Sequence, residues 1–166
     1  MITKKVCLLG EFAVGKTSLA DRFVRHTFSE KYLTTVGVKV DTKTIDVPGK
    51  GSVKLVIWDI NGTDGFSIVE KNYLRGASGV ILVVDGTRRE TLESALKLKQ
   101  TVANILGECS IIGLLNKADL DSQWEVSQAD IADFRKSGIQ IYETSAKSGV
   151  NVNSAFEHLA QMLVAK

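Results

Sequence analysis

Short apolar runs alternate with amphipathic runs along the chain, and this alternation constrains the fold more than any other feature of the sequence. Four segments are strand-like: residues 4–10, 78–86, 110–117 and 139–145. Four others carry apolar residues at helical spacing: residues 16–25, 90–106, 127–138 and a last segment that begins at Asn151, which we expect to cap its helix. Strands that alternate with helices predict an α/β fold with a doubly wound, mostly parallel sheet.

Two further extended runs, residues 35–46 and 52–60, are joined by the sequence VPGKG. Pro48, Gly49 and Gly51 predict a turn there, so the two runs should form a hairpin that supplies one antiparallel edge strand. The 166 residues are enough for a single domain with a sizeable core. Sheets of this kind bind ligands at the carboxyl ends of their strands, so the residues that follow each strand are the candidate functional residues.

The first strand is followed by GEFAVGKT, residues 10–17, a full match to the phosphate-loop pattern. Its glycines allow backbone amides to turn onto phosphate oxygens, and the helix that begins near Lys16 adds its positive end. Lys16 would reach the outer phosphates, and the Thr17 hydroxyl would ligate magnesium. The loop therefore predicts nucleotide binding, but by itself it does not distinguish ATP from GTP.

The third strand ends in WDING, which places Asp59 to hold magnesium through water and Gly62 to offer an amide to a terminal phosphate. The fifth strand ends in NKAD. A carboxylate at Asp119 can accept two hydrogen bonds from the adjacent N–H donors of guanine, whereas adenine would leave it unpaired. Asn116 would bond the base and tie loops together, and the Lys117 stem would pack over the ring.

The sixth strand ends in TSAK, where the Ala146 amide can meet the guanine carbonyl and Lys147 can cover the other face of the base. GEFAVGKT, WDING, NKAD and TSAK, in this order, resemble the motifs of the small Ras-like GTPases over essentially the whole chain. The Rab family is the most similar group, because TTVGVKV, KLVIWD and YLRGASG resemble its first switch, third strand and post-switch stretch. The resemblance implies a Ras-like G domain over residues 1–166, a P-loop NTPase with a six-stranded, mostly parallel sheet, one antiparallel edge strand and helices on both faces.

The resemblance also implies roles that spacing alone does not assign. Phe28 would pack against guanine, Tyr32 would close over the phosphates, and Thr35 would ligate magnesium and sense the third phosphate. Residues about 29–39 and 61–75 would be the two switches, ordered by that phosphate and released on its loss. Signalling by such a switch implies an effector, an exchange factor and an activating protein.

Each function thus has its own set of candidate residues. Those for nucleotide binding are Ala13, Val14, Gly15, Lys16, Thr17, Ser18, Phe28, Tyr32, Thr35, Gly62, Asn116, Lys117, Asp119, Ser145, Ala146 and Lys147. Those for magnesium are Thr17, Thr35 and Asp59, and those for catalysis are Lys16, Thr35, Gly62 and Thr63. The charged residues Glu30, Lys31 and Lys39 would face either an effector or only solvent.

Two positions depart from the family pattern. Thr63 stands where the family usually has a glutamine that orients the attacking water, and one short hydroxyl cannot offer an amide's donor and acceptor together. Phe12 stands where the loop usually carries a small residue, and its ring should project toward the space of the water and of any inserted arginine. Alternatively, the ring could turn to solvent and Asp64 or a partner could position the water.

The sequence leaves three function classes to compare. We expect a GTP/GDP switch with GTP and Mg²⁺ as cofactors and slow intrinsic hydrolysis. The alternative is a GTP-binding module or scaffold with negligible hydrolysis, that is, a pseudo-GTPase. The third class, a phosphotransferase or an ATPase with the same phosphate loop, is disfavoured because NKAD and TSAK are suited to guanine.

The charge balance, +2 from 21 basic and 19 acidic residues, gives no electrostatic case for binding nucleic acid or an anionic membrane. The sequence has no signal peptide and no apolar run of membrane-spanning length. It begins without Met-Gly and ends in QMLVAK without a prenylation cysteine, so we expect no direct membrane anchor in this chain and a cytoplasmic location. The alternatives are that the chain has been trimmed or that it reaches membranes through a partner. Cys7 and Cys109 do not suggest a disulfide framework, nor a zinc site with His26 or His158.

Overall fold

The structure, a computed structural model, describes residues 1–30, 37–60 and 68–165. Within these residues, six strands form one sheet in the order β2-β3-β1-β4-β5-β6. Their bounds are β1 (Ile2–Leu9), β2 (Val38–Val47), β3 (Gly51–Ile60), β4 (Gly79–Asp85), β5 (Ser110–Asn116) and β6 (Gln140–Glu143). The predicted hairpin is confirmed, because β2 pairs antiparallel with β3 at the edge and all other pairs are parallel.

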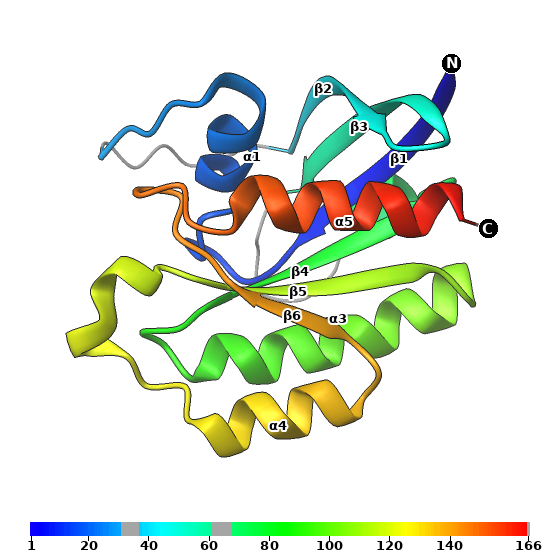
Figure 1. Cartoon of the computed structure of the whole chain (residues 1–166). Helices are drawn as coiled ribbons and strands as arrows, with labels where there is room; N and C mark the ends of the chain where they lie inside the picture. The colour runs from blue at the N-terminus through cyan, green and yellow to red at the C-terminus, as the bar shows by residue number, and fades with distance from the viewer. Residues whose placement is uncertain (31–36, 61–67, 166) are drawn as a thin grey trace.

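Helices cover both faces of the sheet (Figure 1). Their bounds are α1 (Lys16–Arg25), α2 (Ile68–Leu74), α3 (Glu90–Leu106), α4 (Gln128–Lys136) and α5 (Val152–Val164), with a short 3-10 helix η1 (Ala118–Gln123) after β5. α1 and α5 lie on one face, where the Phe23 and Phe156 rings stack with their centroids 4.1 Å apart. α3 and α4 lie on the other face, and a buried cluster on each face forms the core.

The all-apolar pattern of the central strands has the expected physical cause. Every residue of β4 is buried, because helices cover both of its faces. The predicted turn holds Gly49 and Gly51 at φ of 77° and 83°, a conformation that glycine adopts without steric cost. The expectation for strand 35–46 is met from Val38 onward, and residues 35 and 36 lie outside the described ranges.

Three local features differ from the sequence-based expectations. The sequence pattern did not identify α2 and η1, which are short and carry few apolar repeats. Asn151 precedes α5 as predicted, but it does not cap the helix with its side chain. It adopts φ of 58°, a left-handed conformation that asparagine tolerates at a tight turn. Its Nδ2 instead donates to the Glu143 carbonyl at 2.9 Å.

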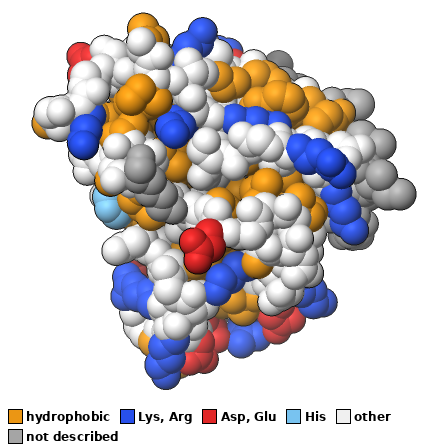
Figure 2. Space-filling view, turned by 90° about the vertical axis from the view of Figure 1, so that its right-hand side faces the viewer, with side chains coloured by type: hydrophobic (Ala, Val, Ile, Leu, Met, Phe, Trp, Pro, Cys, Tyr) orange, Lys and Arg blue, Asp and Glu red, His pale blue; other side chains and the backbone are white. Residues whose placement is uncertain are grey.

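Among the described residues, no helix combines the length and the apolar character needed to cross a membrane. Figure 2 shows the face that carries the right-hand edge of Figure 1, away from the carboxyl end of β1. Basic side chains are scattered there among apolar and acidic ones. This face therefore presents no continuous field of a single charge.

Candidate functional site

The carboxyl ends of β1, β5 and β6 meet at one pocket of about 340 Å³. The pocket is lined by Ala13, Gly15, Ser18, Phe28, Ser29, Glu30, Asn116, Lys117, Asp119, Leu120, Ala146 and Lys147. All of these except Ser29, Glu30 and Leu120 are nucleotide-binding candidates of the sequence analysis, which named Glu30 only as a residue facing an effector or solvent. Segments more than 100 residues apart in the sequence thus contribute to one concave site, as expected at the strand ends of such a sheet.

The loop between β1 and α1 is held from outside by side chains of β5 and the residue after it. The Nδ2 of Asn116 donates to the Val14 carbonyl at 3.0 Å, and the Nζ of Lys117 donates to the Ala13 carbonyl at 3.0 Å. Gly15 has φ of 102°, and a Cβ there would lie 2.3 Å from the Asn116 Nδ2. Glycine is therefore required at this position by both conformation and space.

Lys16 is buried, with 6% of its surface exposed, and its ammonium curls back over the loop. Its Nζ donates to the carbonyls of Gly10 at 3.1 Å and Glu11 at 3.2 Å. Burial is the largest influence on the pKa of Lys16 and lowers it, the nearby Asp59 carboxylate raises it, and the Arg88 charge lowers it, so that the pKa is about 8. A cation that is only partly compensated in this way favours an incoming anion.

Thr17 and Asp59 come from α1 and β3, and the Thr17 hydroxyl donates to an Asp59 carboxylate oxygen. Asp59 is 1% exposed. A hydroxyl and a carboxylate oxygen side by side are hard oxygen ligands of the kind that Mg²⁺ prefers, so the donor set fits this ion. These two residues would hold it; the third candidate ligand, Thr35, lies outside the described residues.

The NKAD and TSAK motifs are joined by a chain of hydrogen bonds. Asp119 accepts from the Ser145 hydroxyl at 2.7 Å, which orients the carboxylate. The Asn116 Oδ1 accepts from the Thr144 hydroxyl and the Ala146 amide, both at 3.3 Å. Asn116 thus bonds the phosphate loop with one end of its side chain and the TSAK loop with the other.

Three contacts position the outer wall of this pocket. Arg22 of α1 donates from Nε to the Ala146 carbonyl at 2.7 Å and from a second nitrogen to the Lys147 carbonyl. The Nζ of Lys147 lies 3.3 Å from a carboxylate oxygen of Glu30. Phe28 lines the same pocket and is 37% exposed. The pocket is thus lined in part by an apolar ring and by lysine side chains with aliphatic stems, surfaces against which a flat base could pack.

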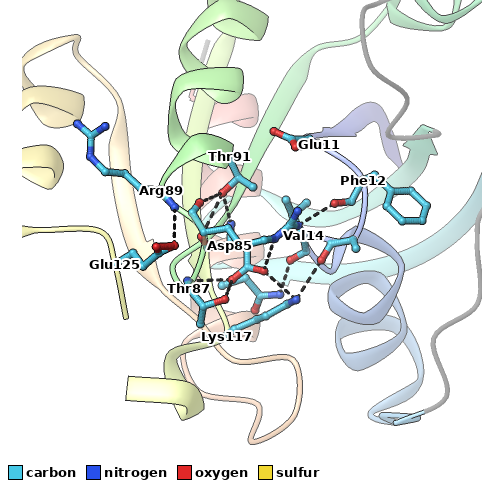
Figure 3. Close-up of polar contacts among 12 residues, drawn as sticks. Glu11, Phe12, Val14, Asp85, Thr87, Arg89, Thr91, Lys117 and Glu125 are labelled. Atoms are coloured by element: carbon cyan, nitrogen blue, oxygen red, sulfur yellow. Dashed lines mark hydrogen bonds and ion pairs between the residues drawn. The ribbon is translucent and has the colours of Figure 1, made fainter. Parts of the chain in front are cut away.

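Phe12 is among the described residues, whereas several other candidates are not. Tyr32, Thr35, Gly62 and Thr63 lie outside the described residues, as do Lys31 and Asp64. The Phe12 side chain is described, and the residue is 46% exposed. Figure 3 shows its carbonyl turned toward the Asp85 side of the loop and its ring on the opposite side.

Sequence reasoning missed a buried carboxylate at the end of β4. Asp85, 1% exposed, accepts from the Thr87 amide at 2.9 Å and hydroxyl at 2.6 Å, and from the Arg88 Nε at 3.0 Å (Figure 3). It also lies 2.9 Å from the Lys117 Nζ. Burial raises its pKa, but the hydrogen bonds from Thr87, Lys117 and Arg88 outweigh burial, so the pKa is lowered overall. The signal was available, because Asp85 is the last residue of an apolar strand and Asp59 likewise lies at the carboxyl end of its strand.

Comparisons with known proteins extend from β1 to the end of α5. The sequence model of the Ras family matches residues 5–165. The chain is 36% identical over 164 residues to Ras-related protein Rab-13 of Canis lupus familiaris, across 98% of this chain and 80% of that protein. It is 36% identical over 165 residues to Ras-related protein SEC4 of Saccharomyces cerevisiae, across 98% and 75%. It is 40% identical over 157 residues to Ras-related protein RABA4b of Arabidopsis thaliana, across 93% and 70%.

Proposed function

This chain belongs to the Ras family of small GTPases, in which it is Rab-like, and on this premise we propose that it is a GTP/GDP switch with slow intrinsic hydrolysis. Binding of GTP and GDP with Mg²⁺ and hydrolysis of GTP are properties of this family. The slow rate, the residue roles and the single G domain over residues 1–166 are our proposals for this chain. The two switches, about 29–39 and 61–75, would contact an effector.

One observation carries the assignment to guanine nucleotides. Asn116 is buried and bonds both Val14 of the phosphate loop and Ala146 of the TSAK loop, so phosphate binding and base binding share one rigid frame. Asp119, held by Ser145, presents a carboxylate to the same pocket. A carboxylate there favours guanine over adenine, because only guanine offers two adjacent N–H donors.

Two properties of this chain support slow hydrolysis. A threonine at position 63 has a shorter reach than an amide and cannot act as donor and acceptor at once toward a water. A phenylalanine at position 12 adds bulk to the loop beside the phosphates, where an arginine from an activating protein would enter. Such an arginine accelerates hydrolysis by roughly 10³ to 10⁵. Because the loop's own contacts use backbone groups, Lys16 and Thr17, nucleotide binding should be intact.

The test is single-turnover phosphate release from protein loaded with GTP and Mg²⁺, followed for hours, with a tenfold excess of ATP in a parallel sample. We expect slow but measurable release and no competition by ATP. GTP still bound at the end would favour the alternative, a GTP-binding module with negligible hydrolysis. Displacement of the bound nucleotide by ATP would contradict both forms of the proposal.

A further inference from the structure

Three consecutive carbonyls of the phosphate loop, those of residues 12–14, each accept a hydrogen bond from a side chain outside the loop. The donors, in order, are the Nη2 of Arg88 at 2.7 Å, the Nζ of Lys117 at 3.0 Å and the Nδ2 of Asn116 at 3.0 Å. When the carbonyl oxygens are hydrogen-bonded on the convex side of the loop, the N–H groups of the same peptides point to its concave side. Anion binding requires N–H groups in that arrangement.

Arg88 differs from the other two donors in its origin. Asn116 and Lys117 belong to the NKAD motif, whereas Arg88 comes from the loop between β4 and α3, outside every motif of the sequence. Its guanidinium makes two contacts at once: Nε to Asp85 at 3.0 Å and Nη2 to the Phe12 carbonyl. The buried Asp85 therefore fixes the orientation of the group that holds residue 12.

Asp85 also couples this contact to the base-recognition side of the site. Its carboxylate lies 2.9 Å from the Nζ of Lys117, so one buried anion orients two cations that bond neighbouring carbonyls of the loop. A second contact adds to the same support, because the Ser94 hydroxyl donates to the Glu11 carboxylate at 2.6 Å. The loop is thus held to the β4–α3 side of the molecule at residues 11 and 12, and at residue 13 by Lys117, which follows β5 and which Asp85 orients. Figure 3 shows Asp85 and Lys117 on the same side of this loop.

We propose that Arg88 is a positioning residue for nucleotide retention: oriented by Asp85, it holds the Phe12 carbonyl and thereby keeps the phosphate loop in its binding conformation. This inference rests on the proposed function, because it requires that the loop bind a guanine nucleotide. The charged donor is bound by a buried carboxylate at one end, so little side-chain freedom is lost when it bonds the loop. Loss of Arg88 should release residue 12 and accelerate nucleotide dissociation.

The experiment measures GDP dissociation from the full chain in the presence of Mg²⁺ for the parent and for Arg88→Ala, Arg88→Lys and Arg89→Ala. Arg89 is the matched control, because it is an adjacent arginine whose contacts are with Glu93 and Asp130. We expect Arg88→Ala to accelerate GDP dissociation about tenfold, as for loss of a charged hydrogen bond. Arg88→Lys should accelerate it by no more than half as much on a logarithmic scale, because lysine keeps a charged donor. Arg89→Ala should match the parent within twofold.

A readout of base recognition separates positioning from general loosening. Inosine diphosphate lacks the amino group that Asp119 would accept from, so the ratio of GDP to inosine diphosphate affinity reports on the base site. This ratio should stay within twofold of the parent in Arg88→Ala, since only the phosphate loop is released. If circular dichroism shows that Arg88→Ala does not fold, Arg88→Gln, which keeps an N–H donor without the charge, replaces it with an expected acceleration of at least threefold.

The outcomes divide cleanly between the two claims. If the parent retains GDP and Arg88→Ala or its replacement dissociates no faster than Arg89→Ala, the inference is wrong and the proposed function stands. A changed base ratio, or no rescue by lysine, also overturns the positioning role. If the parent itself does not retain GDP, the proposed function fails and the inference fails with it.

Discussion

A Cβ on Gly15 would lie 2.3 Å from the Nδ2 of Asn116, which itself bonds the Val14 carbonyl. Gly15→Ala should therefore displace the asparagine that joins the two halves of the site, in addition to straining a residue at φ of 102°. We expect GDP affinity to fall by about a hundredfold or more, as an overlap with a buried hydrogen-bonding group adds to backbone strain of roughly 1–2 kcal/mol.

The matched control for this substitution is Gly107→Ala. Gly107 also has a positive φ, 67°, but among the described residues no atom beyond its chain neighbours lies within 4 Å of the position that a Cβ would take, so only the backbone strain is shared. Affinity in this control should stay near that of the parent when measured by titration with a fluorescent GDP analogue. Equal losses of affinity in the two variants would show that the Asn116 contact has no part in binding.

The second prediction concerns base specificity, which we attribute to the carboxylate of Asp119. In Asp119→Asn, an amide N–H replaces an acceptor that guanine needs, while xanthine offers a carbonyl at the same edge. GDP affinity should fall by at least about a thousandfold, since sites built to bond one group reject a mismatched one by roughly 10⁴, and xanthosine diphosphate should bind better than to the parent. Asp121→Asn makes the same chemical change two residues away and should leave both affinities unaltered.

Magnesium dependence follows from the contact between Thr17 and Asp59. Removal of Mg²⁺ with a chelator should accelerate GDP dissociation from the parent by about tenfold or more, because the ion neutralises charge on the nucleotide phosphates. Thr17→Ala should dissociate rapidly with or without Mg²⁺, whereas Thr17→Ser keeps the hydroxyl and should retain most of the dependence. A Thr17→Ala variant with the full magnesium effect would exclude Thr17 as a ligand.

The fold was predictable where the sequence carried a strong period. β4 and β5 are buried on both faces and read as continuous apolar runs, and the VPGKG turn specified the hairpin. η1 was not predictable in this way, since its residues are held by the base-recognition loop rather than by an apolar face of their own; none of its side chains is buried. Local pattern therefore predicts the longer elements that pack and misses short ones, whether they pack as Leu74 of α2 does or are held by a neighbouring loop as η1 is.

The same distinction applies to the site. Motifs predicted roles for Lys16, Asn116 and Asp119 because each residue type is tied to one chemical task at fixed spacing. Arg88 carries no such signature: the role that we propose for it depends on a hydrogen bond from its Nη2 to a carbonyl 76 positions earlier in the chain, which no local pattern encodes. Asp85 lies between these cases, because its place after a strand was readable but its partners were not.

A fourth prediction concerns stability and pH. Asp130 accepts hydrogen bonds from Arg89 and from the Ser127 amide in the capping box of α4, and these lower its pKa from 3.8 to about 2. A lowered carboxyl pKa contributes stability that is present above the unfolded value and is lost as the pH falls through the folded value. Asp130→Asn should therefore lower Tm at pH 7, and its difference from the parent should shrink as the pH falls from about 4 toward 2.

Asp133→Asn is the control for this measurement. Asp133 lies in the same helix, but its ion pair with Lys136 spans 3.8 Å between two well-exposed side chains and should contribute little. Thermal melts at pH 7, 4 and 3 of both variants with bound GDP give the comparison. A Tm difference for Asp130→Asn that stays constant over this range would mean that the ionised carboxylate does not stabilise the cap.

The last prediction addresses why hydrolysis should be slow. If Thr63 positions water poorly and Phe12 adds bulk beside it, the double variant with Thr63→Gln and Phe12→Gly should hydrolyse bound GTP at least about tenfold faster in single turnover, because oriented water is a large part of the barrier. The two singles separate the causes: Thr63→Gln alone tests water positioning, and Phe12→Gly alone tests bulk. GDP dissociation should be similar in all three variants, since Arg88 bonds the backbone of residue 12, which glycine retains. An unchanged rate in the double variant would place the limit on hydrolysis elsewhere, and the half-exposed Phe12 ring would then matter only to an incoming partner.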